Sequence, residues 1–271
     1  MSSQLIIFTD LDGSLLDPET YRYDQAAEAL ALVKEQNVPL VFCTSKTRAE
    51  VEPLRNEMAN DFPFIIENGG AIFVPPSYFS SMPPEAKERG GYHVIEYGKP
   101  YELLRDGLRT MESKLGIRLK GFGDMTPEEI MATTGLGLEE AIRAKQREYD
   151  EPFLLNDPSK VFELRHEASQ LGLIILVAGR FGHLVGGTHK GQACRVLIDL
   201  YRTKWEEITT AAIGDSLNDL PMLERVDFPC LVERRGGGYQ EGISFKRLTF
   251  LEGIGPVGWA KGVMQLLQQD S

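Results

Sequence analysis

Uninterrupted apolar runs recur along the chain, and each ends abruptly in polar residues, a pattern typical of strands buried on both faces of a sheet. Stretches with helical periodicity separate these runs, so strand, helix and strand form right-handed crossover units of a parallel sheet. The predicted strands are residues 5–8, 38–43, 64–66, 208–213 and 230–232, and the predicted helices are about 24–37, with Asp24 as N-cap, 48–58, 192–201 and 259–267.

The middle of the chain has a different pattern, in which amphipathic helices are mixed with short, partly alternating strands. Residues 118–122 alternate as in an antiparallel strand with one wet face, and Thr126, Pro127 and Glu129 form a helix start with a capping box. Further helices are predicted at 101–115, from 137 to about 149 and near 166–171, and strands at 153–155, 173–178 and 180–185. Residues 239–250 indicate only a loop and a possible strand.

These two patterns predict an α/β protein with two domains. A Rossmann-like parallel-sheet core is expected from residues 1–98 and 187–271, and an inserted α+β cap domain from residues 99–186.

Composition narrows the possible environments and partners. Apolar residues make up 42% of the 271 positions, which is ample for a core, and the net charge of −11 disfavours nucleic acid and anionic membranes as partners. Three widely spaced cysteines, Cys43, Cys194 and Cys230, suggest neither a disulfide framework nor a zinc site. The first apolar run is too short for a signal peptide or a membrane span, so we expect a cytoplasmic protein.

The first strand ends in a close carboxylate pair, Asp10 and Asp12, followed by Gly13. In extended backbone these two side chains point the same way, and two close carboxylates repel unless a cation lies between them or one keeps a proton. A helix cap or an Asx-turn would use the same residues without any chemistry.

The next two strand ends also carry polar groups. Thr44, Ser45 and Lys46 precede a helix whose free N–H groups would suit a phosphate or a carboxylate, although Ser45 or Thr47 would serve equally as a simple N-cap. Residues 67–70, Glu-Asn-Gly-Gly, would let the backbone approach a ligand closely, or would simply form a tight turn to a returning strand at 71–74.

A second carboxylate pair, Asp215 and Asp219, follows the strand at 208–213, and Lys190 stands at a helix start. Parallel strands bring their carboxyl ends to one edge of the sheet, so these scattered residues are expected to converge with Asp10 and Asp12. Several carboxylates with few cations are unstable together, and oxygen ligands of this kind favour Mg²⁺.

In order and spacing, Asp10-Leu11-Asp12-Gly13-Ser14, Thr44, Lys190 and 214–219 resemble the four motifs of the haloacid-dehalogenase superfamily, in its sugar-phosphatase branch with an α+β cap. Ser14 stands where threonine is usual and retains the hydroxyl; His189 before the lysine is another departure.

This resemblance implies a phosphatase mechanism. Asp10 would attack phosphorus and form an aspartyl-phosphate, and Asp12 would protonate the departing oxygen and later deprotonate water. Thr44 and Lys190 would bind the phosphoryl oxygens.

The same resemblance implies a Mg²⁺ site. The ligands would be Asp10, the backbone carbonyl of Asp12 and Asp215, with Asp219 as a further ligand, an outer-sphere group or the residue that orients the lysine.

A closer likeness, to the mannosyl-3-phosphoglycerate phosphatase family, rests on residues 44–48, 67–70, 151–153 and 179–181. It implies hydrolysis of mannosyl-3-phosphoglycerate to mannosylglycerate within compatible-solute synthesis, under a mobile cap. The candidate substrate-binding residues are Ser45, Lys46, Asn68, Gly69, Gly70, Arg165, Arg180, His183 and Asn218, although exposed cap arginines and histidines are often merely solvated. The sequence leaves open a broader sugar-phosphate phosphatase, a phosphomannomutase and a non-catalytic sensor of phosphorylated ligands.

Overall fold

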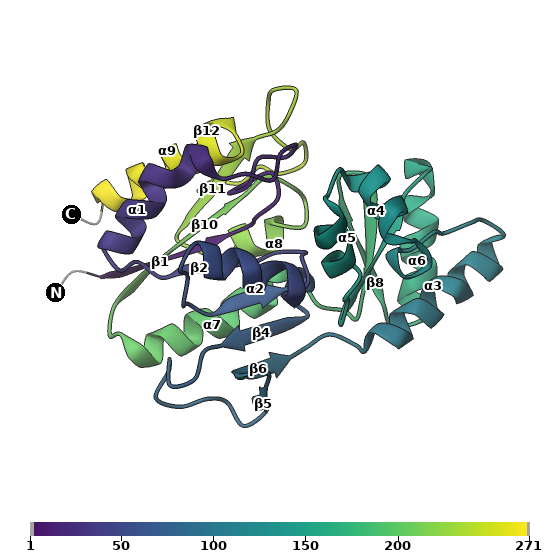
Figure 1. Cartoon of the computed structure of the whole chain (residues 1–271), viewed down its shortest axis with the longest axis horizontal. Coiled ribbons are helices and arrows are strands. Elements are labelled where there is room, and N and C mark those ends of the chain that lie inside the picture. The colour runs from purple at the N-terminus through teal and green to yellow at the C-terminus, as the bar shows by residue number, and fades with distance from the viewer. Residues whose placement is uncertain (1–2, 270–271) are drawn as a thin grey trace.

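The computed structural model describes residues 3–269, which form a larger lobe that holds both ends of the described chain and a smaller lobe beside it (Figure 1). The larger lobe is built on a five-stranded parallel sheet in the order β12-β11-β10-β1-β2. Its strands are β1 (Gln4–Thr9), β2 (Leu40–Phe42), β10 (Ile208–Gly214), β11 (Phe228–Glu233) and β12 (Thr249–Ile254).

The interior strand β1, between β10 and β2, is buried on both faces because alternate side chains enter two separate hydrophobic clusters. Leu5 and Ile7 pack with the helices α1 (Ala27–Glu35) and α9 (Pro256–Gln269), whereas Ile6 and Phe8 pack with α7 (Lys190–Lys204) and α8 (Leu220–Leu223). This burial explains the unbroken apolar run, and the carboxyl end of β1 lies between those of β10 and β2.

An antiparallel sheet extends this lobe, in the order β3-β4-β6-β5. A single parallel bridge between Cys43 and Ile65 connects it to the end of β2, and helix α2 (Arg48–Glu57) lies between β2 and β3 in the chain. The strands are β3 (Phe64–Ile66), β4 (Ala71–Val74), β5 (Lys87–Arg89) and β6 (Tyr92–Glu96).

The smaller lobe has a three-stranded antiparallel sheet, β7-β9-β8, formed by β7 (Asp150–Leu154), β8 (Ile174–Ala178) and β9 (Phe181–Val185). Helices α3 (Tyr101–Leu115) and α6 (Val161–Gln170) contribute with the sheet to one hydrophobic cluster. A second cluster joins α4 (Pro127–Thr134) and α5 (Leu138–Ala144) to Phe122. The lobe therefore has a core of its own.

Several local predictions are confirmed at residue level. Helix α3 has the predicted bounds, and Thr126 and Glu129 form the predicted capping box, with the Thr126 hydroxyl accepting from the Glu129 N–H at 3.3 Å. Thr47 caps α2 in the same way through Glu50.

Five local predictions differ from the structure, one of them the helix predicted from 137 to about 149, which ends at Ala144. The predicted strand at 118–122 is wrong: only Gly121 forms a bridge, to Phe153, because a 3-10 turn begins at Phe122. Asp24 does not cap a helix, since its carboxylate accepts hydrogen bonds from Arg22 instead. The helix predicted near 166–171 begins five residues earlier, at Val161, and the possible strand within 239–250 is β12, which begins only at Thr249.

Across residues 3–269, the helices are all too short or too polar to cross a lipid bilayer.

Candidate active site

Asp10 lies directly after β1 and is held there by its backbone. Its N–H donates to the Ile213 carbonyl at 2.9 Å, and its own carbonyl accepts from the Thr9 hydroxyl at 2.7 Å. The Trp259 indole N–H in turn donates to that hydroxyl at 2.9 Å. Asp10 is 5% exposed, so its carboxylate lies at a fixed position within the sheet edge.

Lys190, the first residue of α7, lies against this carboxylate. Its fully buried Nζ lies 2.5 Å from Asp10 Oδ1 and 2.6 Å from Asp219 Oδ1. The other Asp219 oxygen accepts from the backbone N–H groups of Asp215 and Ser216, both at 3.0 Å. Asp219 therefore shapes its own loop and orients Lys190 at the same time.

Asp12 and Gly13 form the turn beyond β1. The Lys46 ammonium lies 3.0 Å from Asp12 Oδ2, while Asp12 Oδ1 is buried without a hydrogen-bond partner among the described residues. Gly13 has φ +82°, and a Cβ at this position would lie 2.9 Å from Asp215 Oδ2. Glycine is therefore required both for the turn and for the approach of Asp215.

This buried cluster holds more negative than positive charge, and the pKa values of its members are shifted as a result. Burial, together with the Asp219 and Asp215 carboxylates, raises the pKa of Asp10 well above its usual range in spite of Lys190. Burial and Asp219 likewise raise the pKa of Asp215 to about 7. Burial alone would lower the pKa of Lys190, but Asp10 and Asp219 outweigh it and raise that pKa.

These residues fit a divalent cation. One carboxylate oxygen from each of Asp10, Asp215 and Asp219 lies within 4.8 Å of the others, and the unpartnered Asp12 Oδ1 is close in sequence to this set. An all-oxygen donor set with excess negative charge suits Mg²⁺ better than a softer metal. Because Asp219 already binds Lys190 and two N–H groups, Asp10 and Asp215 are the freer ligands.

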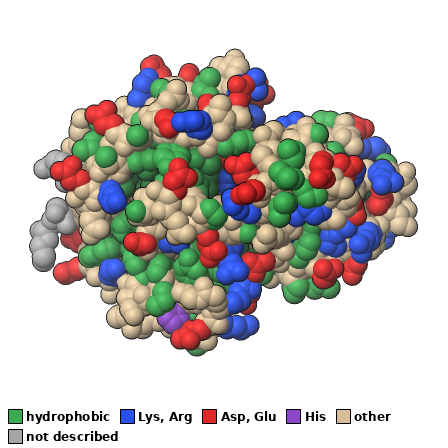
Figure 2. All heavy atoms as spheres, in the orientation of Figure 1, with side chains coloured by type: hydrophobic (Ala, Val, Ile, Leu, Met, Phe, Trp, Pro, Cys, Tyr) green, Lys and Arg blue, Asp and Glu red, His purple; other side chains and the backbone are tan. Residues whose placement is uncertain are grey.

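A cavity of about 250 Å³ opens beside this cluster, between the two lobes. Figure 2 shows basic and acidic side chains gathered where the lobes meet. Eight of the residues predicted from sequence line the cavity: Asp10, Asp12, Ser45, Lys46, Arg180, His183, Asp215 and Asn218. The structure therefore brings together side chains from three strand ends of the larger lobe with His183 of β9 and Arg180 of the turn before β9.

Thr44, Lys190 and Asp219 lie buried behind this lining. The Thr44 hydroxyl accepts from the Lys46 N–H at 3.1 Å, so it shapes the loop that carries Ser45 and Lys46. Lys46 also lies 3.4 Å from Glu50, and although burial lowers its pKa, Asp12 and Glu50 raise it overall.

Four predicted substrate-binding residues do not line the cavity. Asn68, Gly69 and Gly70 are buried in the turn between β3 and β4, where a Cβ on Gly70 would lie 2.4 Å from the Tyr149 Cβ. The turn interpretation of this stretch is therefore the one that the structure supports. Arg165 is exposed on α6, where its Nε donates to the Ile175 carbonyl at 3.3 Å.

Sequence reasoning missed several residues of this region, three of which bear on the site. Arg147 lines the cavity and its guanidinium donates to the Ser45 carbonyl at 2.7 Å, and Tyr21 lines it from the larger lobe. Asp150 lies just behind the cavity lining, and its carboxylate is hydrogen-bonded to His183 Nδ1. Only the docking of the two lobes brings Arg147 and Asp150 here, and no local pattern marks them.

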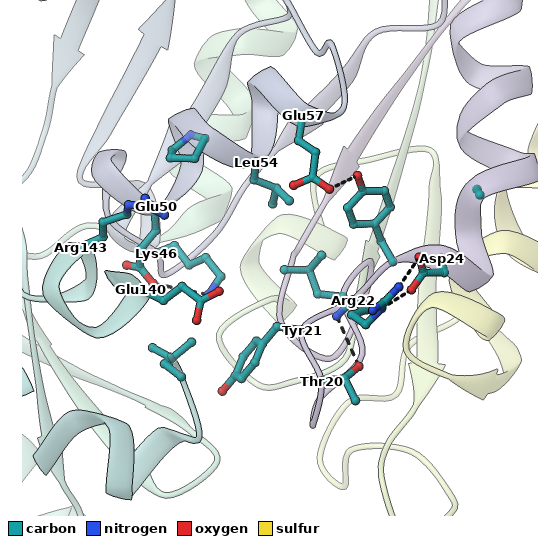
Figure 3. A pocket seen from close by; sticks show the side chains of 15 residues that line it. Thr20, Tyr21, Arg22, Asp24, Lys46, Glu50, Leu54, Glu57, Glu140 and Arg143 are labelled. Atoms are coloured by element: carbon teal, nitrogen blue, oxygen red, sulfur yellow. Dashed lines mark hydrogen bonds and ion pairs between the residues drawn. The ribbon is translucent and has the colours of Figure 1, made fainter. Parts of the chain in front are cut away.

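A second, larger cavity of about 490 Å³ adjoins the first and shares Tyr21, Lys46 and Glu50 with it. Figure 3 shows Lys46, Glu50, Glu140 and Arg143 together on one side and the loop from Thr20 to Asp24 on the other. The edge of the sheet that carries Asp10 is thus continuous with a space large enough for more than a phosphate group.

Comparison with known proteins gives the class that this fold and site define. A family model for haloacid dehalogenase-like hydrolases matches residues 7–87 and 184–234, which leaves most of the smaller lobe outside the match. Two solved structures share the fold: the sucrose-phosphatase from Synechocystis, with TM-score 0.64 and 16% identity over 99% of this chain and 98% of that one, and a haloacid dehalogenase-like hydrolase from B. subtilis, with TM-score 0.66 and 17% identity over 97% and 98%.

Two curated relatives are much more similar in sequence. The glucosyl-3-phosphoglycerate/mannosyl-3-phosphoglycerate phosphatase of Methanococcoides burtonii is 47% identical over 98% of both chains. The mannosyl-3-phosphoglycerate phosphatase of Pyrococcus furiosus is 38% identical over 84% of this chain and 90% of that one. The chain therefore belongs to the glucosyl-3-phosphoglycerate/mannosyl-3-phosphoglycerate phosphatase family of haloacid dehalogenase-like hydrolases. The predicted fold class and enzyme class, a phosphoric monoester hydrolase, are confirmed.

Proposed function

We propose that this protein is a Mg²⁺-dependent phosphatase that hydrolyses mannosyl-3-phosphoglycerate to mannosylglycerate and phosphate, as a step of compatible-solute synthesis in the cytoplasm. The observation that carries the proposal is the buried Asp10–Lys190–Asp219 cluster at the floor of a cavity between two lobes. Relatives covering the whole chain carry this activity in their names.

Asp10 is the nucleophile in this proposal. A carboxylate oxygen attacks phosphorus, the bond from phosphorus to the glycerate oxygen breaks, and the phosphoryl group is left on Asp10. Lys190, 2.5 Å from that carboxylate, offsets the charge that otherwise opposes attack on an anionic phosphate. Thr44 completes the phosphoryl site from its buried position in the neighbouring loop.

Asp12 is the acid and base. It gives a proton to the departing glycerate oxygen and then takes one from a water molecule, which attacks phosphorus and frees Asp10. Asp12 pairs with Lys46 at 3.0 Å, and a substrate carboxylate would compete for that lysine. Binding of the correct substrate would in this way weaken the ion pair between Lys46 and Asp12, the acid.

Asp10, the Asp12 carbonyl and Asp215 would hold Mg²⁺, with Asp219 orienting Lys190. When bound, the cation would supply charge neutralisation to the phosphoryl group and to the crowded carboxylates.

Residues 99–186 act as an inserted cap domain in this proposal. Arg180 and His183 line the cavity from the cap, and Ser45, Lys46 and Asn218 line it from the core. These five residues are the proposed contacts of the glycosylglycerate part. The partner is therefore a small phosphorylated glycoside.

The test uses the whole protein with Mg²⁺. Phosphate release should be abolished by EDTA and by Asp10→Asn, and acid-quenched wild-type enzyme should carry phosphate on the peptide that contains Asp10. Asp199→Asn, an exposed carboxylate on α7, is the matched control. Undiminished phosphate release by Asp10→Asn would refute the mechanism. A variant that releases no phosphate but keeps the protein's biological function would indicate a sensor of phosphorylated ligands.

A further inference from the structure

A continuous buried hydrogen-bonded chain connects the loop after β10 to the cap. The Ser216 hydroxyl donates to Asn218 Oδ1 at 2.6 Å, and Asn218 Nδ2 donates to Asn68 Oδ1 at 3.0 Å. Asn68 Nδ2 donates to Asp150 Oδ2 at 2.8 Å, and His183 Nδ1 lies 2.9 Å from that same oxygen. These side chains belong to four separate segments, so the chain is a tertiary feature of the docked lobes.

Each donor in this chain fixes the orientation of the next group. A flipped Asn68 amide would place its oxygen against the Asp150 carboxylate, which can only accept while it is ionised. Asp150 and Asn68 are fully buried, and His183 and Asn218 are 6% and 5% exposed. An unsatisfied group at any of these places would be costly, so the chain is a rigid support.

The backbone conformation at Asn68 also indicates that surrounding contacts fix this residue in place. Glu67 and Asn68 have φ values of +46° and +56°, a left-handed conformation that side chains other than glycine rarely adopt. Such a conformation persists where surrounding contacts determine it, and the two Asn68 side-chain hydrogen bonds are contacts of that kind.

Ser216 and Asn218 line the substrate cavity from the core, and His183 is the member of the chain that lines it from the cap. It lines the cavity, whereas Asp150 does not, so the Nδ1 edge of the ring faces the buried carboxylate. Nε2 has no hydrogen-bond partner within residues 3–269 and is not a buried unsatisfied atom. This nitrogen is therefore available to a ligand.

We propose that Asp150 is a positioning residue that fixes a proton on His183 Nδ1, so that Nε2 of the neutral ring accepts a hydrogen bond from a hydroxyl of the substrate's glycosyl group. A carboxylate acceptor at Nδ1 requires the proton on that nitrogen, and this leaves the lone pair of the neutral ring on Nε2. The inference rests on the proposed function for the identity of the hydroxyl, but the tautomer does not depend on it.

The replacement Asp150→Asn weakens this arrangement. Asp150 Oδ2 accepts from Asn68 Nδ2 and also faces His183 Nδ1, so the new amide oxygen takes its place and the new NH₂ group takes that of Oδ1, 3.1 Å from Nδ1. The NH₂ group then donates toward Nδ1 and competes with the Nδ1 proton, which shifts part of the neutral rings to the Nε2–H tautomer. In those rings Nε2 donates and no longer accepts a hydrogen bond from a substrate hydroxyl.

The first test is the ¹⁵N NMR signal of the His183 imidazole in the full-length Mg²⁺ form, assigned by its loss in His183→Gln. We expect a protonated Nδ1 and an unprotonated Nε2 in the wild type, and a larger fraction of Nε2–H rings in Asp150→Asn. His166→Gln, an exposed cap histidine, controls for the assignment. A wild-type ring with the proton on Nε2, or with protons on both nitrogens at pH 7.5, would overturn the proposal.

The second test is kinetic. We expect the ratio of kcat/KM for mannosyl-3-phosphoglycerate to that for p-nitrophenyl phosphate to fall about 10- to 100-fold in Asp150→Asn. The exposed cap variant Asp106→Asn should leave this ratio unchanged. A merely structural role for Asp150 would lower both activities together and leave the ratio intact, which would refute the inference. If the wild type does not turn over the glycosylated substrate, the proposed function fails while the NMR test still decides the role of Asp150.

Discussion

Lys190 Nζ lies 2.5 Å from Asp10 Oδ1, although the two residues are 180 positions apart in the chain. Asp10 directly follows β1 and Lys190 begins the helix that packs on that strand, so the fold itself creates the pair. The same ammonium also binds Asp219, which means that two buried carboxylates share one cation.

Replacing this cation should be costly for stability. Lys190→Met leaves the Asp10 and Asp219 carboxylates buried without their partner, and we expect a loss of about 3 to 5 kcal/mol in the free energy of unfolding. Urea titrations in EDTA measure this loss, with Lys34→Met, an exposed lysine of α1, as the control. Equal stability of the wild type and Lys190→Met would contradict the assignment of Lys190 as the balancing charge.

Removing the acid should affect substrates according to their leaving group. Asp12→Asn should lower kcat on an alkyl phosphate such as the natural substrate by about 10²- to 10⁴-fold, because the alkoxide then leaves without a proton. With p-nitrophenyl phosphate, a good leaving group, we expect a burst of one p-nitrophenol per enzyme followed by slow turnover. Stopped-flow absorbance measures the burst.

Asp24→Asn, an exposed residue paired with Arg22, is the control for that experiment and should show no burst. Equal losses on both substrates, with no burst in Asp12→Asn, would mean that Asp12 is not the acid and base.

Mg²⁺ should stabilise the folded protein through the carboxylate cluster. At 100 times its dissociation constant, Mg²⁺ should add about 2.7 kcal/mol to the free energy of unfolding. Asp215→Asn should lose most of this gain, because it removes one of the two freer ligands, whereas Asp199→Asn should keep it. Thermal unfolding with and without Mg²⁺ tests this, and an undiminished gain in Asp215→Asn would place the cation elsewhere.

Glu67 should make stability depend on pH. Burial raises the pKa of this carboxyl to about 8, although Arg147 and the Tyr149 N–H favour its ionised form, while the Asp150 carboxylate opposes it. Because this folded pKa exceeds the ordinary value near 4.5, the folded state holds an extra proton between about pH 4.5 and 8. The contribution of Glu67 is thus fully present below pH 4.5 and is lost as the pH rises toward 8.

Urea unfolding at pH 5 and pH 8 measures this effect. We expect Glu67→Gln to remove on the order of a few kcal/mol from the decline in stability between these two pH values. Glu28→Gln, an exposed residue of α1, should leave the decline as it is. A wild-type profile unchanged by Glu67→Gln would show that Glu67 ionises normally.

Much of the core could be predicted because its signals are local. Unbroken apolar runs identify strands buried on both faces, and parallel strands necessarily gather Asp10, Thr44 and Asp215 at one edge. The capping box at Thr126 depends on residues three positions apart, so sequence spacing was sufficient to predict it, whereas Thr47 was only one of two candidate N-caps of α2.

The cap contribution to the site was harder to predict because it depends on docking. Arg165 and Arg180 look alike in sequence, yet only Arg180 faces the cavity. The importance of Asp150 arises from Asn68 and His183, residues 82 and 33 positions away. The alternation at residues 118–122 failed to give a strand because only one bridge to β7 forms there.

The most direct test of the central claim is the rate of phosphate release with Mg²⁺ from four compounds: mannosyl-3-phosphoglycerate, glucosyl-3-phosphoglycerate, 3-phosphoglycerate and mannose 6-phosphate. We expect higher kcat/KM for the two glycosylated phosphoglycerates, and no release from any of the four in EDTA. Equal or higher values for 3-phosphoglycerate or mannose 6-phosphate would contradict the proposed substrate and indicate a general sugar-phosphate phosphatase. Dependence on a bisphosphate activator, with transfer rather than release of phosphate, would indicate a phosphomannomutase instead.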